Sequence, residues 1–253
     1  MPKDTAKATF DTAIKRAEYL LRLAFGLTNH RQRRIRRDWA ASFKQVMHWP
    51  KSKAIERIDS KDAVIILRHV SNLSLDDFSS DALQDCLRAS LVMAVSALDA
   101  YFHAKIIRYV VQHSRTKEPS KKLLNAKILV RDFIEGRKKR RSNVALRAAI
   151  ERNLSYQALQ QPAQIAEALC LIGVSNFWKS VAKQMGQADQ QICTHLTKIV
   201  KRRNQIVHEG DLNQSKKARN KSRPITHKEV EKSIALLKGI VSAAEAIINQ
   251  QVK

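Results

Sequence analysis

The sequence predicts a protein that is almost entirely α-helical. Only six glycines and five prolines interrupt its 253 residues. Apolar residues recur at spacings of three and four, the period of an amphipathic helix, instead of alternating as they do in a strand. The segment 81–113 contains neither glycine nor proline and is apolar on most of its circumference between Leu87 and Val111. Such a segment indicates a helix buried in the middle of a bundle.

Three helices are predicted before this central segment. The first runs from about Asp4 to Phe25, with apolar residues along one side. The stretch RQRRIRRDWAASFKQVMHW follows; its first turns carry five arginines, its second half is apolar, and Pro50 ends it. A short helix, SKDAVIILRHVSN, is expected to begin at Ser60, because serine is a favourable N-cap.

A turn-rich stretch, LSLDDFSSD, marks a boundary near residues 72–80. We therefore divide the chain into a basic, helical N-terminal extension, residues 1–75, and a helical domain, residues 76–253. After the central helix, a segment rich in lysine and arginine leads to three further predicted helices, at 144–159, 162–171 and 176–186.

Two helices complete the predicted bundle. The first runs from near Ala188 to Gly210, since glycine is the usual residue just after a helix end. A polar, basic loop follows, and residues Thr226 to Glu229 have the spacing of a capping box at the start of the last helix.

The charge of the chain indicates a polyanionic partner. Lysine and arginine number 47 against 23 acidic residues, a formal charge of +24, which attracts polyanions over a long range. RNA or another nucleic acid is the leading candidate, and an anionic membrane surface is the alternative. The N-terminus is charged where a signal peptide needs an apolar run, and the longest apolar stretch, LVMAVSAL, is far shorter than the roughly 20 residues of a membrane span. We expect a soluble protein without a membrane partner.

The cysteines give no sign of a metal site or a disulfide framework. Cys86, Cys170 and Cys193 are widely spaced and form no C-x-x-C pair. A reducing cytoplasm fits this usage best. We expect no metal and no cofactor, since the sequence also has no glycine-rich phosphate loop and no pattern for paired-carboxylate or Ser/His/Asp catalysis.

One short segment, KRRNQIVHEGD (201–211), carries candidate chemistry. Asn204 and His208 are four residues apart and share a helix face, and Arg203 has a side chain long enough to reach the same point. RNA is cleaved without metal when its 2′-hydroxyl attacks the adjacent phosphate. In that reaction His208 would move a proton, Arg203 would stabilise the charged transition state, and Asn204 would orient the imidazole or the phosphate.

A bare Arg-x4-His pattern is weak evidence, because the chain contains a second copy. Arg108 and His113 match it at the end of the central helix, and we interpret that copy as a chance match. The copy at Arg203 differs in having an asparagine directly after the arginine and a glycine that ends the helix. A solvated basic helix end with a capping histidine is equally compatible with this spacing.

Several segments resemble the HEPN superfamily, and specifically its RiboL-PSP-HEPN branch: LVMAVSALDAYFHAKI, NFWKSVAKQM, RRNQIVHEGDL, and RPIT before the last helix. The similarity covers about residues 80–250, and Arg203, Asn204 and His208 match the Arg-Asn-x-x-x-His element of the family. The resemblance implies an α-helical bundle and, in active members, a metal-independent ribonuclease of toxin–antitoxin or antiviral systems. Many relatives pair two protomers so that both motifs line one cleft, which implies a homodimer here.

Two polar residues interrupt the central helix. Asp99 and His103 are four apart and therefore lie on one face. The resemblance implies that Asp99 supports the site by holding Arg203 or His208 in place, and His103 is the second candidate for a supporting role. The alternative is a local pair between Asp99 and His103, or a partner such as Lys105, that only satisfies a buried charge.

The basic tracts are predicted to contact phosphates or solvent and not to react. Nine residues are the candidates for nucleic-acid binding: Arg33, Arg34, Arg36, Arg37, Lys138, Lys139, Arg140, Arg141 and Arg202.

These observations predict an all-α, HEPN-like helical bundle with an N-terminal helical extension. Its predicted function is that of a metal-independent endoribonuclease, with RNA as substrate and an antitoxin or defence-system protein as a further partner. A non-catalytic RNA-binding or scaffold protein with a silent motif is the alternative. A helix-turn-helix DNA binder has less support, since no short apolar helix pair with a glycine turn stands out.

Overall fold

The structure, a computed structural model, describes residues 5–28, 31–32, 37–46, 48, 50, 57–60, 63–66, 80–127, 129–131, 134, 142–212 and 222–252. Its elements in chain order are α1 (Thr5–Thr28), β1 (Arg31–Gln32), α2 (Arg37–Val46), β2 (Arg57–Ser60), β3 (Ala63–Ile66), α3 (Ser80–His113), α4 (Lys121–Leu124), α6 (Ser142–Ser155), α7 (Pro162–Leu169), the 3-10 turn η2 (Cys170–Ile172), α8 (Phe177–Met185), α9 (Asp189–Glu209) and α10 (His227–Gln251).

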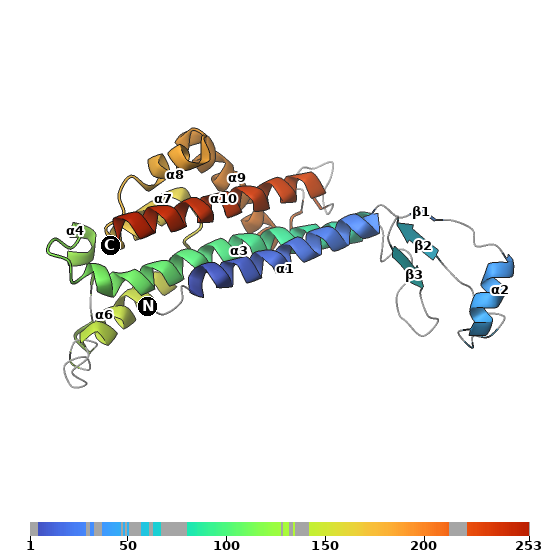
Figure 1. The fold of residues 1–253 in the computed structure, drawn as a ribbon, viewed down its shortest axis with the longest axis horizontal. Coiled ribbons are helices and arrows are strands. Elements are labelled where there is room, and N and C mark those ends of the chain that lie inside the picture. Colours follow the sequence, from blue (N-terminus) through green and yellow to red (C-terminus); the bar gives the residue numbers. More distant parts are fainter. Residues whose placement is uncertain are drawn as a thin grey trace.

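Three long helices, α1, α3 and α10, lie side by side along the long axis of the molecule (Figure 1). The central one is α3, because α1, α6, α9 and α10 all pack against it. Its residues Ala94, Val95 and Leu98 are completely buried, as expected for a helix that is apolar all round. The prediction of an all-α bundle around a buried central helix is confirmed.

Aromatic rings connect the layers of the bundle. Phe10 of α1 meets Tyr101 of α3 edge to face, with ring centroids 5.9 Å apart, and Tyr101 meets Phe102 in the same way at 5.1 Å. Phe102 in turn contacts Phe177, the first residue of α8, at 5.9 Å. Rings prefer such edge-on contacts because their electron-rich faces attract the positive ring edges. The chain of rings therefore runs from α1 through α3 to α8.

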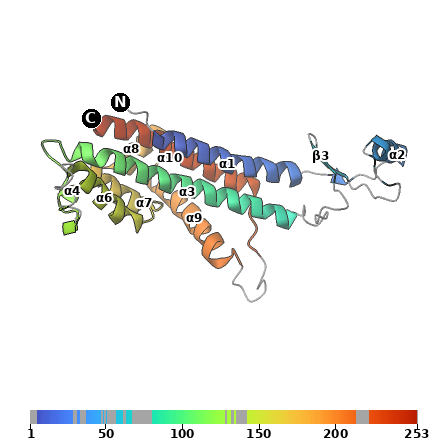
Figure 2. The same ribbon diagram turned by 90° about the horizontal axis from the view of Figure 1, so that it is seen from below.

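The shorter helices α6, α7 and α9 pack against α3, and the C-terminal end of α9 points away from the long axis of the bundle. α9 runs obliquely to α1, α3 and α10 (Figure 2). Its buried residues, Ile192, Leu196 and Val200, recur every four positions and face the core. In the next turn of the helix, Arg203 and Asn204 are only partly buried, because the helix is leaving the bundle there.

Two sequence-based expectations in the N-terminal region were wrong. The helix predicted from Arg31 is present over Arg37–Val46, whereas Arg31 and Gln32 form β1 and pair with β2. The helix predicted to begin at Ser60 is instead part of a three-stranded antiparallel sheet, in which Ser60 ends β2 and pairs with Ala63 at the start of β3. The residues of β3 read Ala-Val-Ile-Ile. Branched side chains of this kind favour strands, and periodicity cannot distinguish a helix from a strand in so short an apolar run.

The N-terminal region has two parts: α1 belongs to the helical bundle, and the segments that follow α1 extend from it. β1, β2, β3 and α2 lie beyond one end of the bundle (Figure 1). α1, however, packs along α3, and the hydroxyl of Ser90 donates a hydrogen bond of 2.7 Å to the carbonyl of Ala17. The core therefore includes α1, and a boundary near residue 75 stays a prediction.

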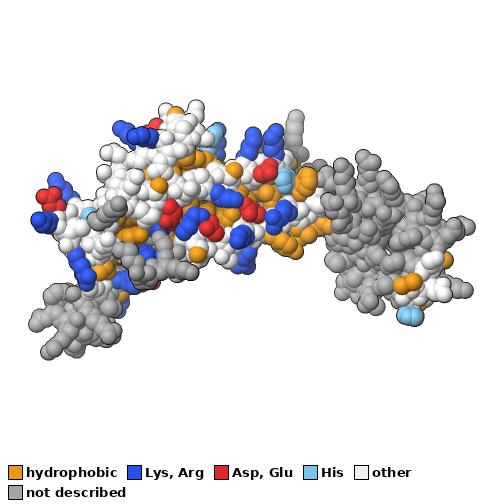
Figure 3. All heavy atoms as spheres, in the orientation of Figure 1, with side chains coloured by type: hydrophobic (Ala, Val, Ile, Leu, Met, Phe, Trp, Pro, Cys, Tyr) orange, Lys and Arg blue, Asp and Glu red, His pale blue; other side chains and the backbone are white. Residues whose placement is uncertain are grey.

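By length and composition, one described helix could cross a membrane, residues Ala82–His113 of α3, but 56% of its apolar stretch is buried inside the structure. The core helix of a soluble bundle has the same length and apolar composition. A second candidate arises only if the segments Pro162–Ile172 and Phe177–Met185, bent by 109°, are taken as one span. Acidic and basic side chains are mixed over α1 and α10 on the face shown in Figure 3, as on a solvated surface. These features are consistent with a soluble protein.

His113 closes the C-terminal end of α3 and has a structural role. Its ring is buried at 9% exposure, and Nε2 accepts a hydrogen bond of 2.9 Å from the backbone amide of Ser120. Gly173, at φ +80°, packs so closely on the ring that any side chain there would clash with it. Burial lowers the pKa of His113. The ring is therefore neutral in the folded protein, since an imidazolium nitrogen cannot accept a hydrogen bond.

This burial predicts a loss of stability in mild acid. Because the pKa of His113 is lowered on folding, the unfolded chain binds more protons, and the free energy of unfolding falls as the pH drops below the ordinary histidine value of about 6.5. In His113→Gln, where the amide oxygen still accepts from Ser120, that slope should be shallower. Urea unfolding at pH 7 and pH 5 measures how the free energy of unfolding depends on pH in the unchanged protein and in His113→Gln. An equal pH dependence in the two proteins would contradict a buried, neutral His113.

Candidate functional site

The motif residues occupy the last two turns of α9. The guanidinium of Arg203 donates a hydrogen bond of 3.0 Å from Nη1 to Oδ1 of Asn204. Its Nε is buried and has no hydrogen-bond partner among the described residues. Arg203 is thus half-buried, held at one end by its neighbour, and retains an unused donor.

His208 lies one turn beyond Asn204 on the same face and is exposed. Within the part of the chain that the structure describes, its ring makes no hydrogen bond or ion pair. Two exposed apolar side chains stand close to it in the chain, Val207 at 46% exposure and Leu212 at 41%. The imidazole is therefore accessible to a substrate or to a second protein.

The backbone turns sharply just after the motif. Gly210 and Asp211 adopt left-handed conformations, with φ +61° and +58°. The amide of Asp211 donates a hydrogen bond of 3.0 Å to the carbonyl of Gln205 and so closes the helix end. Gly210 has no side chain to oppose this conformation, and aspartate tolerates it better than most residues. The predicted stop at Gly210 is confirmed.

A buried ion cluster holds this turn against α3. The carboxylate of Asp211 is 1% exposed; its Oδ2 accepts hydrogen bonds from Arg88 Nε at 2.7 Å and from Arg202 Nη2 at 2.9 Å. Arg202 Nη1 lies 2.9 Å from Oδ1, although without hydrogen-bond geometry. The carbonyl of Arg223 accepts from both guanidinium groups, at 2.7 Å from Arg88 and 3.1 Å from Arg202. We call Arg88, Arg202 and Asp211 the arginine clamp.

The clamp joins three segments that are distant in the chain. Arg88 belongs to α3, Arg202 and Asp211 to the end of α9, and Arg223 to the segment that enters α10. The Arg223 amide also donates a hydrogen bond of 2.8 Å to the Asp211 carbonyl. Burial lowers the pKa of Arg88, but its hydrogen bonds to Asp211 and Asp85 outweigh burial, so the pKa is raised overall. Arg88 therefore stays charged.

Sequence reasoning missed Arg88 and Asp211 and assigned Arg202 to phosphate binding. The structure engages Arg202 with Asp211 and with the carbonyls of Arg223 and Pro224. A phosphate contact by Arg202 stays a prediction, but it would compete with these bonds. The available signals were an arginine inside the apolar part of the central helix and an acid directly after the helix-ending glycine.

Asp99 and His103 lie at a different junction. Oδ1 of Asp99 accepts a hydrogen bond from the backbone amide of Leu159, and Nε2 of His103 lies 3.1 Å from the carbonyl of Gln157. The two side chains are 3.7 Å apart. Among the described residues, neither bonds to Arg203 or His208. The structure therefore favours the local pair, which ties α3 to the connection between α6 and α7.

Lys105, the other suggested partner, is completely buried on α3. Its Nζ lies 2.7 Å from Oε2 of Glu245 on α10. This pair joins the two helices far from the motif. The histidine of the second Arg-x4-His copy, His113, is likewise a packing residue, which agrees with its interpretation as a chance match.

Most of the predicted phosphate-binding residues lie outside the described part. This applies to Arg33, Arg34 and Arg36, and to Lys138, Lys139, Arg140 and Arg141; Arg37 begins α2, but its side chain is not described. Among the described residues, no group of three or more histidine, cysteine, aspartate or glutamate side chains is placed to hold a metal ion.

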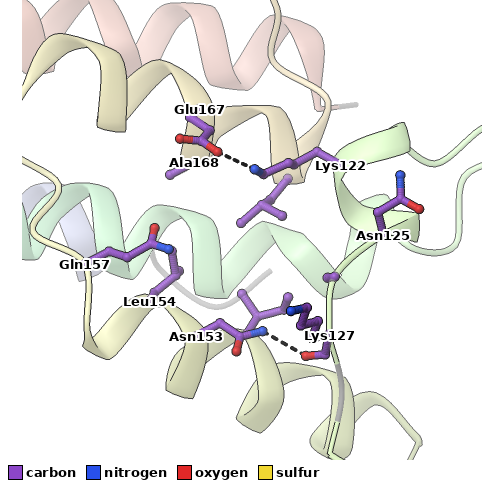
Figure 4. A pocket seen from close by; sticks show the side chains of 11 residues that line it. Lys122, Asn125, Lys127, Asn153, Leu154, Gln157, Glu167 and Ala168 are labelled. Carbon is purple, nitrogen blue, oxygen red and sulfur yellow. Dashed lines mark hydrogen bonds and ion pairs between the residues drawn. The ribbon is translucent and has the colours of Figure 1, made fainter.

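A hollow of about 360 Å³ lies at the other end of the bundle, between α4, α6 and α7 (Figure 4). Lys122 is paired with Glu167 at its edge, and Asn153 donates a hydrogen bond of 2.9 Å to the carbonyl of Lys127. Ile150 and Leu154 contribute apolar surface. The polar groups of Lys122 and Asn153 are thus already paired with other residues of the protein, and Arg203, Asn204 and His208 do not line this hollow.

The fold and the motif define a helical protein of the HEPN class, whose function is related to nucleic acids. The family model RiboL-PSP-HEPN matches residues 58–250. The chain belongs to the RiboL-PSP-HEPN family. Comparison with curated proteins and with solved structures gives no significant match.

The clamp predicts unequal effects for the two acids that contact Arg88. Asp211→Asn keeps the size of the side chain but leaves two arginines without their buried carboxylate, which should lower the free energy of unfolding by about 3 kcal/mol. Asp85, whose side chain is 76% exposed, is the matched control, and Asp85→Asn should cost less than about 1 kcal/mol. Denaturant titrations compare them; equal losses would show that the clamp does not stabilise the fold.

Proposed function

We propose that the protein is a metal-independent endoribonuclease and that the end of α9 is its active site. The observation that supports this most directly is an exposed His208, on the face of Asn204, beside a half-buried Arg203 whose guanidinium is held by the side chain of Asn204. The clamp keeps the helix end in place while the imidazole remains accessible. An ordinary solvated helix end would not need such support.

In the proposed reaction the 2′-oxygen of RNA attacks the adjacent phosphorus, and the bond from phosphorus to the 5′-oxygen breaks. A base takes the proton of the 2′-hydroxyl and an acid protonates the leaving 5′-oxygen. His208 performs one of these proton transfers, a role typically worth about 10²- to 10⁴-fold in rate. Arg203 stabilises the charge on the phosphoryl oxygens through its planar fork of donors.

Cleavage should therefore persist in excess EDTA and leave a 2′,3′-cyclic phosphate and a 5′-hydroxyl. Arg203→Ala and His208→Ala should each reduce the rate by at least about 100-fold while RNA binding is largely retained. End-group analysis of a labelled RNA and anisotropy titrations measure both properties. Arg108→Ala is the control, and its activity should stay close to that of the unchanged protein.

A strict requirement for magnesium, or full activity in both motif variants, would reject the assignment. The alternative function is a non-catalytic RNA-binding or scaffold protein, which the charge of +24 favours independently of the motif. RNA binding without any cleavage by the unchanged protein would favour this alternative.

We further propose that the enzyme works as a two-fold dimer, since one helix end supplies one histidine for two proton transfers. A symmetric pair would place two imidazoles and two guanidinium groups around one phosphate. The exposed apolar side chains of Val207 and Leu212 beside His208 provide a surface for such a contact. Repulsion between the two basic helix ends would be offset by bound RNA.

The dimer predicts rescue between two inactive chains. If each site takes Arg203 from one protomer and His208 from the other, refolding equal amounts of Arg203→Ala and His208→Ala chains together yields mixed dimers with one intact site. Activity above that of either variant alone should return, because about half of the dimers are mixed and each mixed dimer keeps one intact pair of Arg203 and His208. Light scattering should show a mass near twice 28.8 kDa.

An active protein that stays monomeric would refute the dimer. No rescue in a verified mixed dimer would show that each site takes both residues from one chain. An antitoxin or another defence-system protein as a binding partner, and a cytoplasmic location, belong to the same proposal and are supported only by the family membership.

A further inference from the structure

A groove of about 650 Å³ runs between α9 and α10, away from the motif face. Leu91 of α3 lies at its floor, flanked by Ile199 of α9 and Leu236 of α10, and Met185 at the end of α8 lines it as well. Its volume is in the range of sites that bind small molecules or clusters of side chains, roughly 300–1,000 Å³.

Both banks of the groove carry exposed positive charge. Lys198 stands on α9 and Lys232 on α10, and in the described part of the chain neither has a carboxylate partner. One acid, Glu229, lines the groove, in the first turn of α10 where the helix dipole favours it. Lys122, at the hollow between α4 and α6, differs because it is already paired with Glu167. The α9–α10 groove thus combines an apolar floor with a lysine on each edge, Lys198 and Lys232, that has no acidic partner among the described residues.

The groove is separate from the proposed active site but adjoins its support. By the helical period, the groove-facing residues of α9 lie on a different side of the helix from Asn204 and His208. Arg202 lines the groove and at the same time holds Asp211 in the arginine clamp. A molecule in the groove would therefore contact the residue that supports the end of α9.

Three kinds of occupant can be compared by chemistry. Sites for single-stranded nucleic acid use several aromatic rings to stack the bases, whereas the floor here is made of Leu91, Ile199, Leu236 and Met185, and the single ring that lines the groove is that of His195. A second copy of the chain would bring a further charge of +24 against two uncompensated lysines. An acidic partner has neither disadvantage, since its carboxylates would neutralise both banks and its apolar side chains would cover the floor.

We propose that the α9–α10 groove binds an acidic amphipathic helix of a partner protein. The groove lies between two helices, and a third helix fits such a site with apolar side chains at positions i, i+3 or i+4, and i+7. Acidic residues that flank this apolar row meet Lys198 on one bank and Lys232 on the other. This inference does not rest on RNA cleavage, because it uses none of the motif residues.

The test uses a display library of helical peptides with a fixed apolar row and flanking positions drawn from Asp, Glu, Lys, Ser and Gln. Selection on the full-length protein, with excess heparin to remove non-specific binders, should enrich peptides with acidic flanks. The double variant Lys198→Glu/Lys232→Glu should weaken binding of the selected peptide at least tenfold by fluorescence anisotropy. The control Lys201→Glu/Lys228→Glu changes the charge equally on the same two helices but outside the groove, and should weaken it less than threefold.

A second variant tests the floor without changing charge. Ala235 is exposed and lines the groove, so Ala235→Trp should fill it and also weaken the peptide at least tenfold. Circular dichroism verifies that each variant is folded. Failure to enrich acidic peptides, or equal weakening by the groove and control pairs, would overturn the proposal. It would also be overturned if the groove pair abolished RNA binding or dimer formation while peptide binding persisted.

Discussion

The position of the whole candidate site depends on one buried carboxylate. Asp211 lies between Arg88 of the central helix and Arg202 of α9, and its backbone pairs with Arg223 at the entrance to α10. A buried acid is costly unless it is paired and hydrogen-bonded. Here two guanidinium groups pair with the carboxylate and both donate hydrogen bonds to its Oδ2, and Asp211 adopts a left-handed conformation at this position. Three segments that are distant in the chain are held together at this point, so that α9 can leave the bundle and still end at a defined place.

The helices could be predicted from the sequence because a long segment with apolar residues every three or four positions buries them on one side only when it is helical. The central helix from Asp81 to His113 and the stop at Gly210 are present, and Thr226 caps the last helix by accepting a hydrogen bond from the Glu229 amide, which is one half of the predicted capping box. The short apolar run at 63–66 was ambiguous, and pairing with a neighbouring strand decided its state. Periodicity describes one helix at a time, whereas strand pairing depends on residues elsewhere in the chain.

The candidate site was only partly predictable for a similar reason. Arg203, Asn204 and His208 form a local pattern, and helix geometry alone places Asn204 and His208 on one face. The clamp joins residues 123 positions apart, Arg88 and Asp211, and no local pattern shows that pairing. The same limit explains Asp99, whose partner at Leu159 is 60 residues away. A polar residue in a buried helix predicts that a partner exists but does not identify it.

The central claim is that the end of α9 binds the phosphate that RNA cleavage attacks. A crystal structure with a short RNA made inert by 2′-deoxy substitution at the cleaved position tests this most directly. The account predicts a backbone phosphate within hydrogen-bonding distance of Arg203, with His208 of the same or the second protomer beside the substituted 2′ position or the 5′-oxygen. RNA bound only along the basic tracts, with Arg203 and His208 free of phosphate, would contradict it.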